Sequence, residues 1–128
     1  MNEPGDNLAT LLSAWTAMLR TGRTAELAGI LAADVVWQGL RPELRCANRD
    51  QVLGVLVRNR GRPPRITRIE AQERGAQVAV SVEGADLPEA PVELATAARS
   101  LVFTFRDGRV VRMESLPDRD AAFARLLE

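Results

Sequence analysis

Apolar residues in the first part of the chain recur at helical spacing in two successive blocks. The first block, residues 8–19, begins after Asp6, a residue type that caps helices, and ends before Gly22. Thr24 is placed to cap a second, shorter block over residues 27–31. We therefore expect a long first helix followed by a short one.

From Asp34 the spacing of apolar residues changes to two, which is typical of a strand. One face of this strand carries Val35, Trp37 and Gly39, and the other carries Val36, Gln38 and Leu40. After the strand, Asn48 and Gln51 have the spacing of a capping box and predict the start of a third helix. The Gly- and Pro-containing stretch at 60–64 is expected to end that helix.

The second half of the chain is strand-like. Strands are predicted over 65–73 and 77–84, joined at Arg74-Gly75, and over 94–105 and 109–116, joined at the hairpin signal Asp107-Gly108. Residues 85–93 form the loop between the two pairs, and Asp118 is placed to cap a last short helix. No repeat or linker divides the chain. Residues 1–128 are therefore predicted to form one α+β domain, with helices on one face of a curved antiparallel sheet.

The composition is that of a soluble globular protein. Hydrophobic residues make up 46% and charged residues 27% of the 128 positions, and no apolar run approaches the roughly 18 residues of a membrane span. Seventeen basic residues balance seventeen acidic ones, which argues against nucleic acid or a membrane as a partner. The polar N-terminus is unlike a secretory signal, and the single cysteine, Cys46, excludes an internal disulfide. A cytoplasmic location is expected.

The residue types that are missing narrow the possible chemistry. The sequence has no His, no Tyr and no Lys. Without His it lacks the usual general base, and three Cys or His ligands for zinc cannot be assembled. Without Lys and Tyr it lacks a Schiff-base amine and a phenolic oxyanion donor. We therefore expect no metal and no cofactor, and any acid–base chemistry must use Asp or Glu.

The order of elements and two stretches of sequence resemble the nuclear transport factor 2-like superfamily, in particular its SnoaL-like, polyketide cyclase-like branch. The stretches are LLSAWTAMLRTGRTAELAGILAADVVWQG at the front and LVFTFRDGRVVRMESLPDRDAAFARL at the back, and the resemblance covers nearly the whole chain. It implies a cone-shaped curved antiparallel sheet wrapped around the long N-terminal helix, with two further helices and an apolar pocket open at one end. Members of the superfamily include isomerases, cyclases, epoxide hydrolases, binding proteins and dimerising adaptors, so the fold alone does not fix the function.

The catalytic positions of related enzymes are filled by other residue types in this chain. In an alignment with ketosteroid isomerases of the superfamily, their helix Tyr falls at Trp15, their Asp base at Gly39 and their second Asp at Leu101. An indole N–H can still donate one hydrogen bond, but neither Gly39 nor Leu101 can transfer a proton. The limonene epoxide hydrolases use a Tyr that this chain lacks. No catalytic residue is therefore assigned.

Strand alternation predicts a mainly apolar interior, because residues on the same side as Gly39 and Leu101 face inward. They are Val35, Trp37, Arg99, Phe103 and Phe105, with Val78, Val80 and Val82 as a further row and, from hairpin pairing, Val111, Met113 and Ser115. The predicted ligand-binding residues are Trp15, Trp37, Gly39, Arg99, Leu101, Phe103, Met113 and Ser115, with Glu43 and Cys46 at the lip of the pocket. Asp34, Gln38, Glu83 and Glu114 are expected to face outward. A one-residue bulge would reverse such an assignment.

Three functions remain open. The leading one is the binding of a small hydrophobic molecule, such as a polyketide-, terpenoid- or steroid-like compound. The second is a cyclase or isomerase whose acid is Glu43, Asp50 or Asp86 after a shift of register, and the third is a dimerising scaffold with a vestigial pocket. Arg99 is compatible with several of these, because it can pair with Glu93 or Asp86, contact an acceptor on a ligand, or reach solvent.

A homodimer is also expected. The outward positions of the later strands are small or moderately apolar, and such a sheet face usually packs against something. They include Ala79, Ser81, Ala98, Val102 and Thr104. Many proteins of the superfamily that the chain resembles pair through this face.

Overall fold

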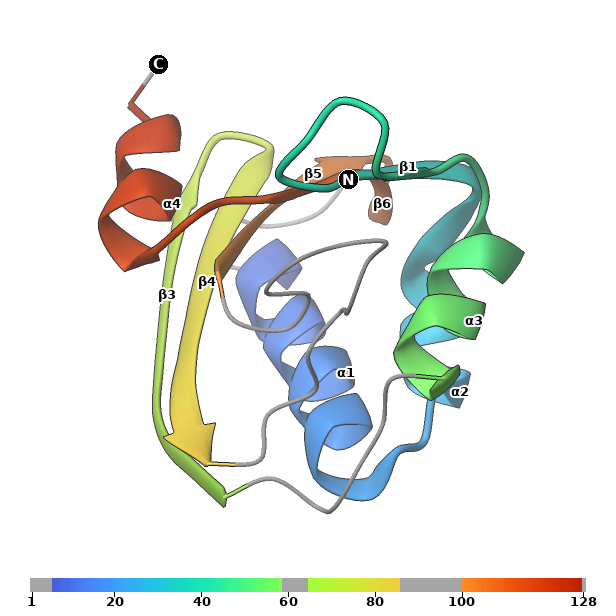
Figure 1. Cartoon of the computed structure of the whole chain (residues 1–128), viewed down its shortest axis with the longest axis horizontal. Helices are drawn as coiled ribbons and strands as arrows, with labels where there is room; N and C mark the ends of the chain where they lie inside the picture. The colour runs from blue at the N-terminus through green and yellow to red at the C-terminus, as the bar shows by residue number, and fades with distance from the viewer. Residues whose placement is uncertain (1–5, 59–64, 86–99, 128) are drawn as a thin grey trace.

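The computed structural model describes residues 6–58, 65–85 and 100–127 (Figure 1). The chain opens with two helices, α1 (Asp6–Thr21) and α2 (Ala25–Ile30). Between them Gly22 adopts a φ of 75° and its N–H donates to the Met18 carbonyl at 2.9 Å, which ends α1 as predicted. Thr24 stands at the N-cap of α2, but its side chain makes no capping hydrogen bond. Its backbone is already near-helical (φ −107°, ψ 0°) rather than extended, so the predicted role of its hydroxyl is wrong.

A strand and a third helix follow. Strand β1 (Leu31–Gln38) begins at Leu31 rather than at Asp34, and the two-residue strand β2 (Arg45–Cys46), which was not predicted, pairs with it. Helix α3 (Arg49–Arg58) starts with the predicted capping pair. The Gln51 N–H donates to Oδ1 of Asn48 at 2.9 Å, and Oε1 of Gln51 accepts from the Ala47 N–H at 2.7 Å.

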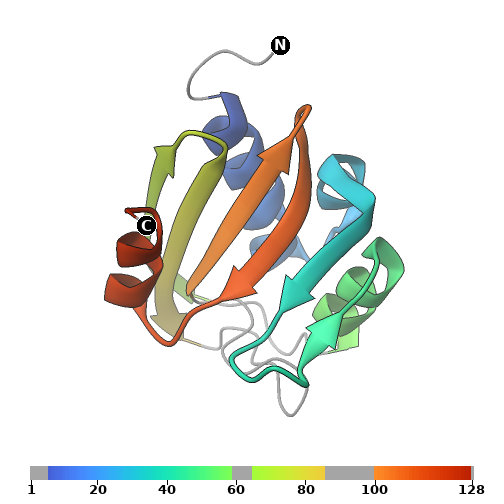
Figure 2. The same ribbon diagram turned by 90° about the horizontal axis from the view of Figure 1, so that it is seen from above.

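Four further strands complete a six-stranded sheet. They are β3 (Arg65–Arg74), β4 (Gln77–Ala85), β5 (Ser100–Arg106) and β6 (Arg109–Ser115), and the order across the sheet is β2-β1-β6-β5-β4-β3. Neighbouring strands are antiparallel except β1 and β6, which run parallel, so the sheet is mixed rather than wholly antiparallel. Figure 1 and Figure 2 show the sheet bending around α1, with α2 and α3 near β1. This is an α+β fold with a helix inside a curved sheet.

A bulge in the β5–β6 hairpin corrects one inward assignment. The register shifts so that Phe105 pairs with Val110, while Thr104 pairs with Arg112. Val111 is therefore the extra residue of the bulge and is only half-buried, whereas Val110 is 0% exposed. The prediction that Val111 faces inward is wrong, because regular pairing was assumed along the whole hairpin.

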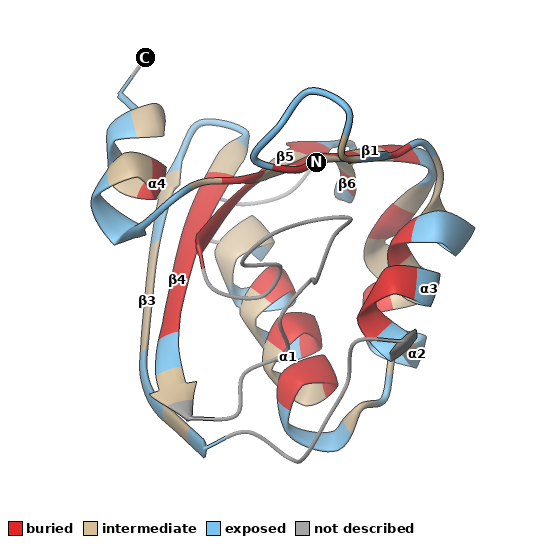
Figure 3. Ribbon diagram, in the orientation of Figure 1, coloured by how far each residue is buried: buried red, intermediate tan, exposed pale blue. Residues whose placement is uncertain are grey.

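The core fills the space between α1, α3 and the inner face of the sheet. Buried residues concentrate on these helices and on the central strands, while the β3 edge is exposed or half-buried (Figure 3). The predicted inner row on β4 is confirmed, because Val78, Val80 and Val82 are at most 3% exposed. No helix within the described residues is both long enough and apolar enough to span a membrane.

A last helix, α4 (Arg119–Arg125), packs on the outer face of the sheet. Asp118 caps it as predicted, since its side chain accepts from the Ala121 N–H at 2.8 Å. Ala122 and Leu126 of this segment form a second buried cluster with Ala79 of β4 and Val102 of β5.

This second cluster covers part of the sheet face from which the homodimer was predicted. Ala79 and Val102, two of the outward residues from which the dimer was predicted, already have a partner within the same chain. Ser81 is also buried and Thr104 is half-buried, while Ala98 lies outside the described residues.

Candidate functional site

A row of inward side chains crosses five strands of the sheet. Pairing sets Val78 opposite Phe103, Phe103 opposite Met113, Met113 opposite Trp37, and Trp37 opposite Cys46. All five side chains are between 0% and 5% exposed. Because directly opposed residues lie on the same face of a sheet, this row forms a wall that faces α1. We call it the inner wall, and it confirms the inward side predicted for Trp37, Phe103 and Met113.

Trp37 and Ser115 are joined across the inner wall. The Nε1–H of Trp37 donates to Oγ of Ser115 at 2.9 Å, and both side chains are buried. Ser115 lies opposite Leu101 of β5, which is 0% exposed. A buried indole N–H usually finds a partner, and here the partner comes from a strand 78 residues later in the chain. The hydrogen bond fixes where the indole lies against the wall.

Trp15 reaches the same wall from α1. Its ring meets the ring of Phe103 edge to face, with the centroids 5.2 Å apart and the planes at 73°. Trp15 is 0% exposed, yet its Nε1–H has no hydrogen-bond partner among the residues that the structure describes. A buried donor without an acceptor costs roughly 1–3 kcal/mol. The Trp15 Nε1–H is therefore a buried, unsatisfied hydrogen-bond donor beside the inner wall.

The segment between β1 and α3 is held by Gln38 and by its own backbone. The Gly39 N–H donates to the Leu44 carbonyl at 2.7 Å. The Nε2 of Gln38 lies 2.9 Å from the carbonyl oxygen of Arg41 and 3.3–3.4 Å from those of Gly39, Pro42 and Leu44. Gly39 is buried, as expected for an inward position. The outward side chain of Gln38 thus closes the loop over residues 39–44.

The two residues predicted at the lip lie in different surroundings. Glu43 is exposed and forms an ion pair with Arg41 at 3.5 Å. Cys46 is 5% exposed and belongs to the core, because β2 sets it opposite Trp37. Cys46 is therefore a member of the inner wall rather than part of an exposed lip.

One carboxylate shares the inner face of the sheet. Glu73 of β3 lies opposite Val78 and is half-buried. It is two strands away from Phe103, a lateral distance of about 10 Å at the usual strand spacing. Sequence reasoning missed Glu73 because alternation was followed along the other strands only. Carrying the pairing across the turn at 75–76 would have found it.

The other carboxylates considered as acids lie elsewhere. Asp50 is exposed on α3, and Glu83 is exposed on β4, as its outward assignment predicted. Asp86 and Arg99 fall outside the described residues, so their roles stay predictions. Within the described ranges, no three His, Cys, Asp or Glu side chains gather into a group that could hold a metal ion.

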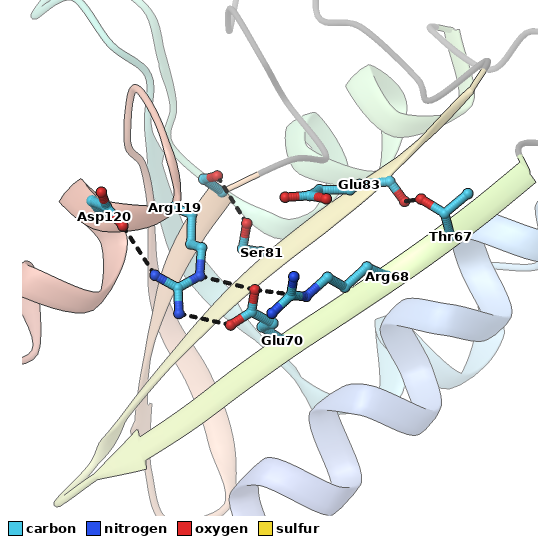
Figure 4. A network of polar contacts seen from close by, with 8 residues as sticks. Thr67, Arg68, Glu70, Ser81, Glu83, Arg119 and Asp120 are labelled. Carbon is cyan, nitrogen blue, oxygen red and sulfur yellow. Dashed lines mark hydrogen bonds and ion pairs between the residues drawn. The ribbon is translucent and has the colours of Figure 1, made fainter.

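A charged network lies on the outer face and fixes α4 there (Figure 4). Arg119 donates two hydrogen bonds to Glu70 of β3, one from Nε at 2.9 Å and one from a terminal nitrogen at 2.7 Å. It also pairs with Asp120 at 2.9 Å, and Arg68 approaches Glu70 at 3.0 Å. The hydrogen bonds from Arg119, helped by the charges of Arg119 and Arg68, hold the pKa of the Glu70 carboxyl below its ordinary value. This network belongs to the packing of α4 and not to the inner wall.

The arrangement of α1 inside a bent mixed sheet is the nuclear transport factor 2-like fold. No protein-family model and no curated protein matches the sequence. Solved structures do match, all at low identity. A nuclear transport factor 2-like protein from Anabaena variabilis superposes with a TM-score of 0.65 at 14% identity, over 95% of this chain and 97% of its own.

Two further matches illustrate the range of proteins with this fold. A candidate polyketide cyclase from Xanthomonas campestris has a TM-score of 0.65 at 18% identity, over 94% of this chain and 96% of its own. A hypothetical protein from Catenulispora acidiphila with a ketosteroid isomerase-like fold, solved in complex with trimethylamine, has a TM-score of 0.61 at 17% identity and covers 89% of both chains. At these identities the likeness establishes the fold alone.

Proposed function

We propose that the protein binds a small hydrophobic molecule, of the size of a polyketide, terpenoid or steroid, between α1 and the inner wall. The observation that carries this proposal is the buried Nε1–H of Trp15, which has no acceptor among the described residues. A residue with only a packing role gains nothing from such a donor, because the donor loses its hydrogen bond with water on folding. A bound molecule would supply the missing acceptor.

Binding without acid–base catalysis agrees with the residues at the wall. Gly39 and Leu101, which the resemblance in sequence aligns with the two acids of ketosteroid isomerases, are buried and carry no titratable group. Isomerisation requires a base poised in a dry site, and without His, Tyr or Lys that base would have to be a carboxylate, which neither Gly39 nor Leu101 supplies. We therefore propose that the protein has no ketosteroid isomerase activity.

Fluorescence of the two tryptophans tests the binding function, because both indoles are fully buried beside the proposed ligand. A panel of uncharged terpenoid and steroid-like compounds is expected to quench or shift the emission in a saturable way. Trp37→Ala should weaken binding by about 2–3 kcal/mol through the lost aromatic contact. Val57→Ala, at an exposed position on α3, is the matched control. Unchanged emission across the panel would favour a scaffold with a vestigial pocket.

A cyclase or isomerase is the second candidate, and the observation that favours it is Glu73 on the inner face. Glu73→Gln removes the carboxylate while keeping the shape of the side chain. Under the binding proposal this variant keeps its ligand affinity, as do variants of Glu83 and other outward carboxylates. Turnover of a ligand that is abolished by Glu73→Gln would replace the binding proposal with the enzymatic one. Arg99→Ala is expected to matter only for ligands that carry an acceptor.

A further inference from the structure

Exposed arginines gather at one end of the outer face of the sheet, the face opposite to the inner wall. Arg112 of β6 lies opposite Thr104 of β5. Thr104 lies opposite Gln77 of β4, and Gln77 lies opposite Arg74 of β3. At the usual strand spacing this row is about 14 Å wide. Its centre is polar and uncharged, because Nε2 of Gln77 donates to Oγ1 of Thr104 at 3.1 Å.

The turn of the β5–β6 hairpin adds two more arginines. Arg106 and Arg109 are exposed and lie directly opposite each other on either side of the turn. The turns at 75–76 and 107–108 lie at the same end of the sheet (Figure 2), where the Phe105 N–H donates to the Ala76 carbonyl at 2.8 Å. We call Arg74, Arg106, Arg109 and Arg112 together the arginine surface.

The bulge at Val111 is what brings Arg112 to this surface. With regular alternation, residue 111 would follow Arg109 on the outer face and residue 112 would point inward. The extra residue instead leaves Val110 and Met113 buried on the inner side and sets Arg112 opposite Thr104 on the outer side. Arg109 and Arg112 therefore share one face although they are three residues apart.

The charges of the arginine surface are not balanced by carboxylates of the described residues. The arginines that form ion pairs within those residues are Arg41, Arg68, Arg119 and Arg125. Like charges directly opposite each other destabilise a strand pair, so the opposed Arg106 and Arg109 cost the hairpin stability. An anionic partner would remove this repulsion.

The surroundings of the arginine surface distinguish between anionic partners. The exposed large apolar side chains within the described residues are Leu40, Val57 and Leu127, and none lies on β3–β6 to anchor the surface in a membrane. The aromatic rings are buried, or half-buried in the case of Phe123 beneath Arg119, so none is free to stack on a nucleic acid base. The net charge of zero adds no wider attraction for a phosphate backbone.

We propose that the arginine surface binds an extended acidic segment of another protein. A guanidinium donates two parallel hydrogen bonds to a carboxylate, so each arginine can hold one Asp or Glu side chain of such a segment. Alternate side chains of an extended segment lie about 6.6 Å apart, which is also the distance between successive outward residues of a strand. This interaction lies on the other side of the sheet from the proposed ligand and does not depend on it.

Four labelled probes test the proposal against the full chain by fluorescence anisotropy. They are a decapeptide in which Glu and Ser alternate, its Gln counterpart, a thymidine hexanucleotide and phosphatidylserine vesicles. In about 50 mM salt, where exposed charges are weakly screened, the Glu peptide is expected to bind at least ten-fold more tightly than the other three. Its affinity should fall as salt is added. This comparison uses the unaltered protein.

A pair of variants with equal changes of charge assigns the binding to the surface. Arg106→Gln/Arg109→Gln is expected to weaken binding of the Glu peptide about ten-fold, since each exposed ion pair contributes modestly. The same variant should raise the melting temperature, because it removes the repulsion across the hairpin. Arg20→Gln/Arg23→Gln, two exposed positions at the end of α1, is the control and should change neither quantity.

Several outcomes would overturn the proposal. Equal binding of the Glu and Gln peptides, or no binding of any probe, would show that the surface has no acidic partner. Tighter binding of the nucleotide or the vesicles would mean that the class of partner is wrong. A lower melting temperature with unchanged peptide affinity in Arg106→Gln/Arg109→Gln would make these arginines structural. Self-association of the full chain that this variant abolishes would identify the partner as a second copy.

Discussion

At the scale of single residues, the two tryptophans of the core are expected to contribute differently to stability. Trp37 donates to Ser115 at 2.9 Å, whereas the Trp15 N–H has no partner among the described residues. Replacing either by Phe removes the same volume, so the difference between the variants reports the hydrogen bond. Without ligand, we expect Trp37→Phe to lower the free energy of unfolding by about 1–2 kcal/mol more than Trp15→Phe. Urea unfolding followed by circular dichroism measures both.

A double-mutant cycle checks this assignment. Ser115→Ala leaves the Trp37 N–H buried without an acceptor, and the combined Trp37→Phe/Ser115→Ala should cost less than the sum of the two single changes. Two results would contradict a stabilising role for the Trp37–Ser115 hydrogen bond. One is a double variant whose loss of free energy equals the sum of the two single losses. The other is an equal loss for Trp37→Phe and Trp15→Phe.

The amide of Gln38 carries a second residue-scale prediction. Its Nε2 lies within 3.4 Å of four backbone carbonyl oxygens between Gly39 and Leu44. Gln38→Glu puts a carboxylate, which has no proton to donate, among those oxygens. We expect Gln38→Glu to lower the free energy of unfolding at pH 7 by about 2–3 kcal/mol. The loss caused by Gln38→Leu is expected to be smaller than this by about 1 kcal/mol. The control is Gln72→Glu, because Gln72 is exposed on β3. Equal melting temperatures for Gln38→Glu, Gln38→Leu and Gln72→Glu would contradict the role of the Gln38 amide.

At the scale of elements, α4 is expected to be the part of the fold most sensitive to acid and salt. It has seven residues, too few for a stable isolated helix, and it is fixed by Arg119–Glu70 and Arg125–Glu114 around a small apolar contact. The pKa of Glu70 is lowered in the folded state. The contribution of Glu70 to the stability of the packed α4 is therefore complete above the unfolded-state pKa of about 4.3. It is lost as the pH falls through the folded-state pKa.

The methyl resonances of Ala122 and Leu126 report this change directly. We expect them to shift toward unpacked values at acid pH and in 1 M salt, before the signals of the inner core change. Glu70→Gln should weaken the docking of α4 at neutral pH and remove much of its dependence on acid. Glu83→Gln, an exposed carboxylate on β4, should have neither effect. Simultaneous loss of α4 and core signals in the native chain would show that the helix does not detach separately.

The elements that could be predicted are those whose signals are local. Asn48 with Gln51 and Asp118 mark helix starts, and the turn at Asp107-Gly108 marks a hairpin, because each motif satisfies backbone groups next to it. The bulge at Val111 leaves no such mark, since Val110 and Val111 are the same residue type. Likewise, alternation located Trp37 and Ser115 on the inner face, but their hydrogen bond depends on how β1 and β6 meet.

At the scale of the whole molecule, α4 bears on self-association. It covers Ala79 and Val102, which belong to the face from which a homodimer was predicted. Removing residues 117–128 uncovers this patch without touching the inner wall. We expect the truncated chain to associate more strongly than the full chain, whose monomer mass is 14.0 kDa, in light scattering at micromolar concentration. A truncated chain that folds and shows no more association than the full chain would mean that the patch is not an interface.

The parallel pairing of β1 with β6 has a consequence for how the protein is made. The bond between Trp37 and Ser115 spans 78 residues, so Trp37 emerges from the ribosome long before its partner exists. At about 5–20 residues translated per second, the apolar strand around Val35 and Trp37 waits roughly 4 to 16 seconds with most of its edge unpaired. During that interval the unpaired edge of β1 is accessible to chaperones and to strands of other chains. The interval ends when β6, the last strand to be synthesised, pairs with β1.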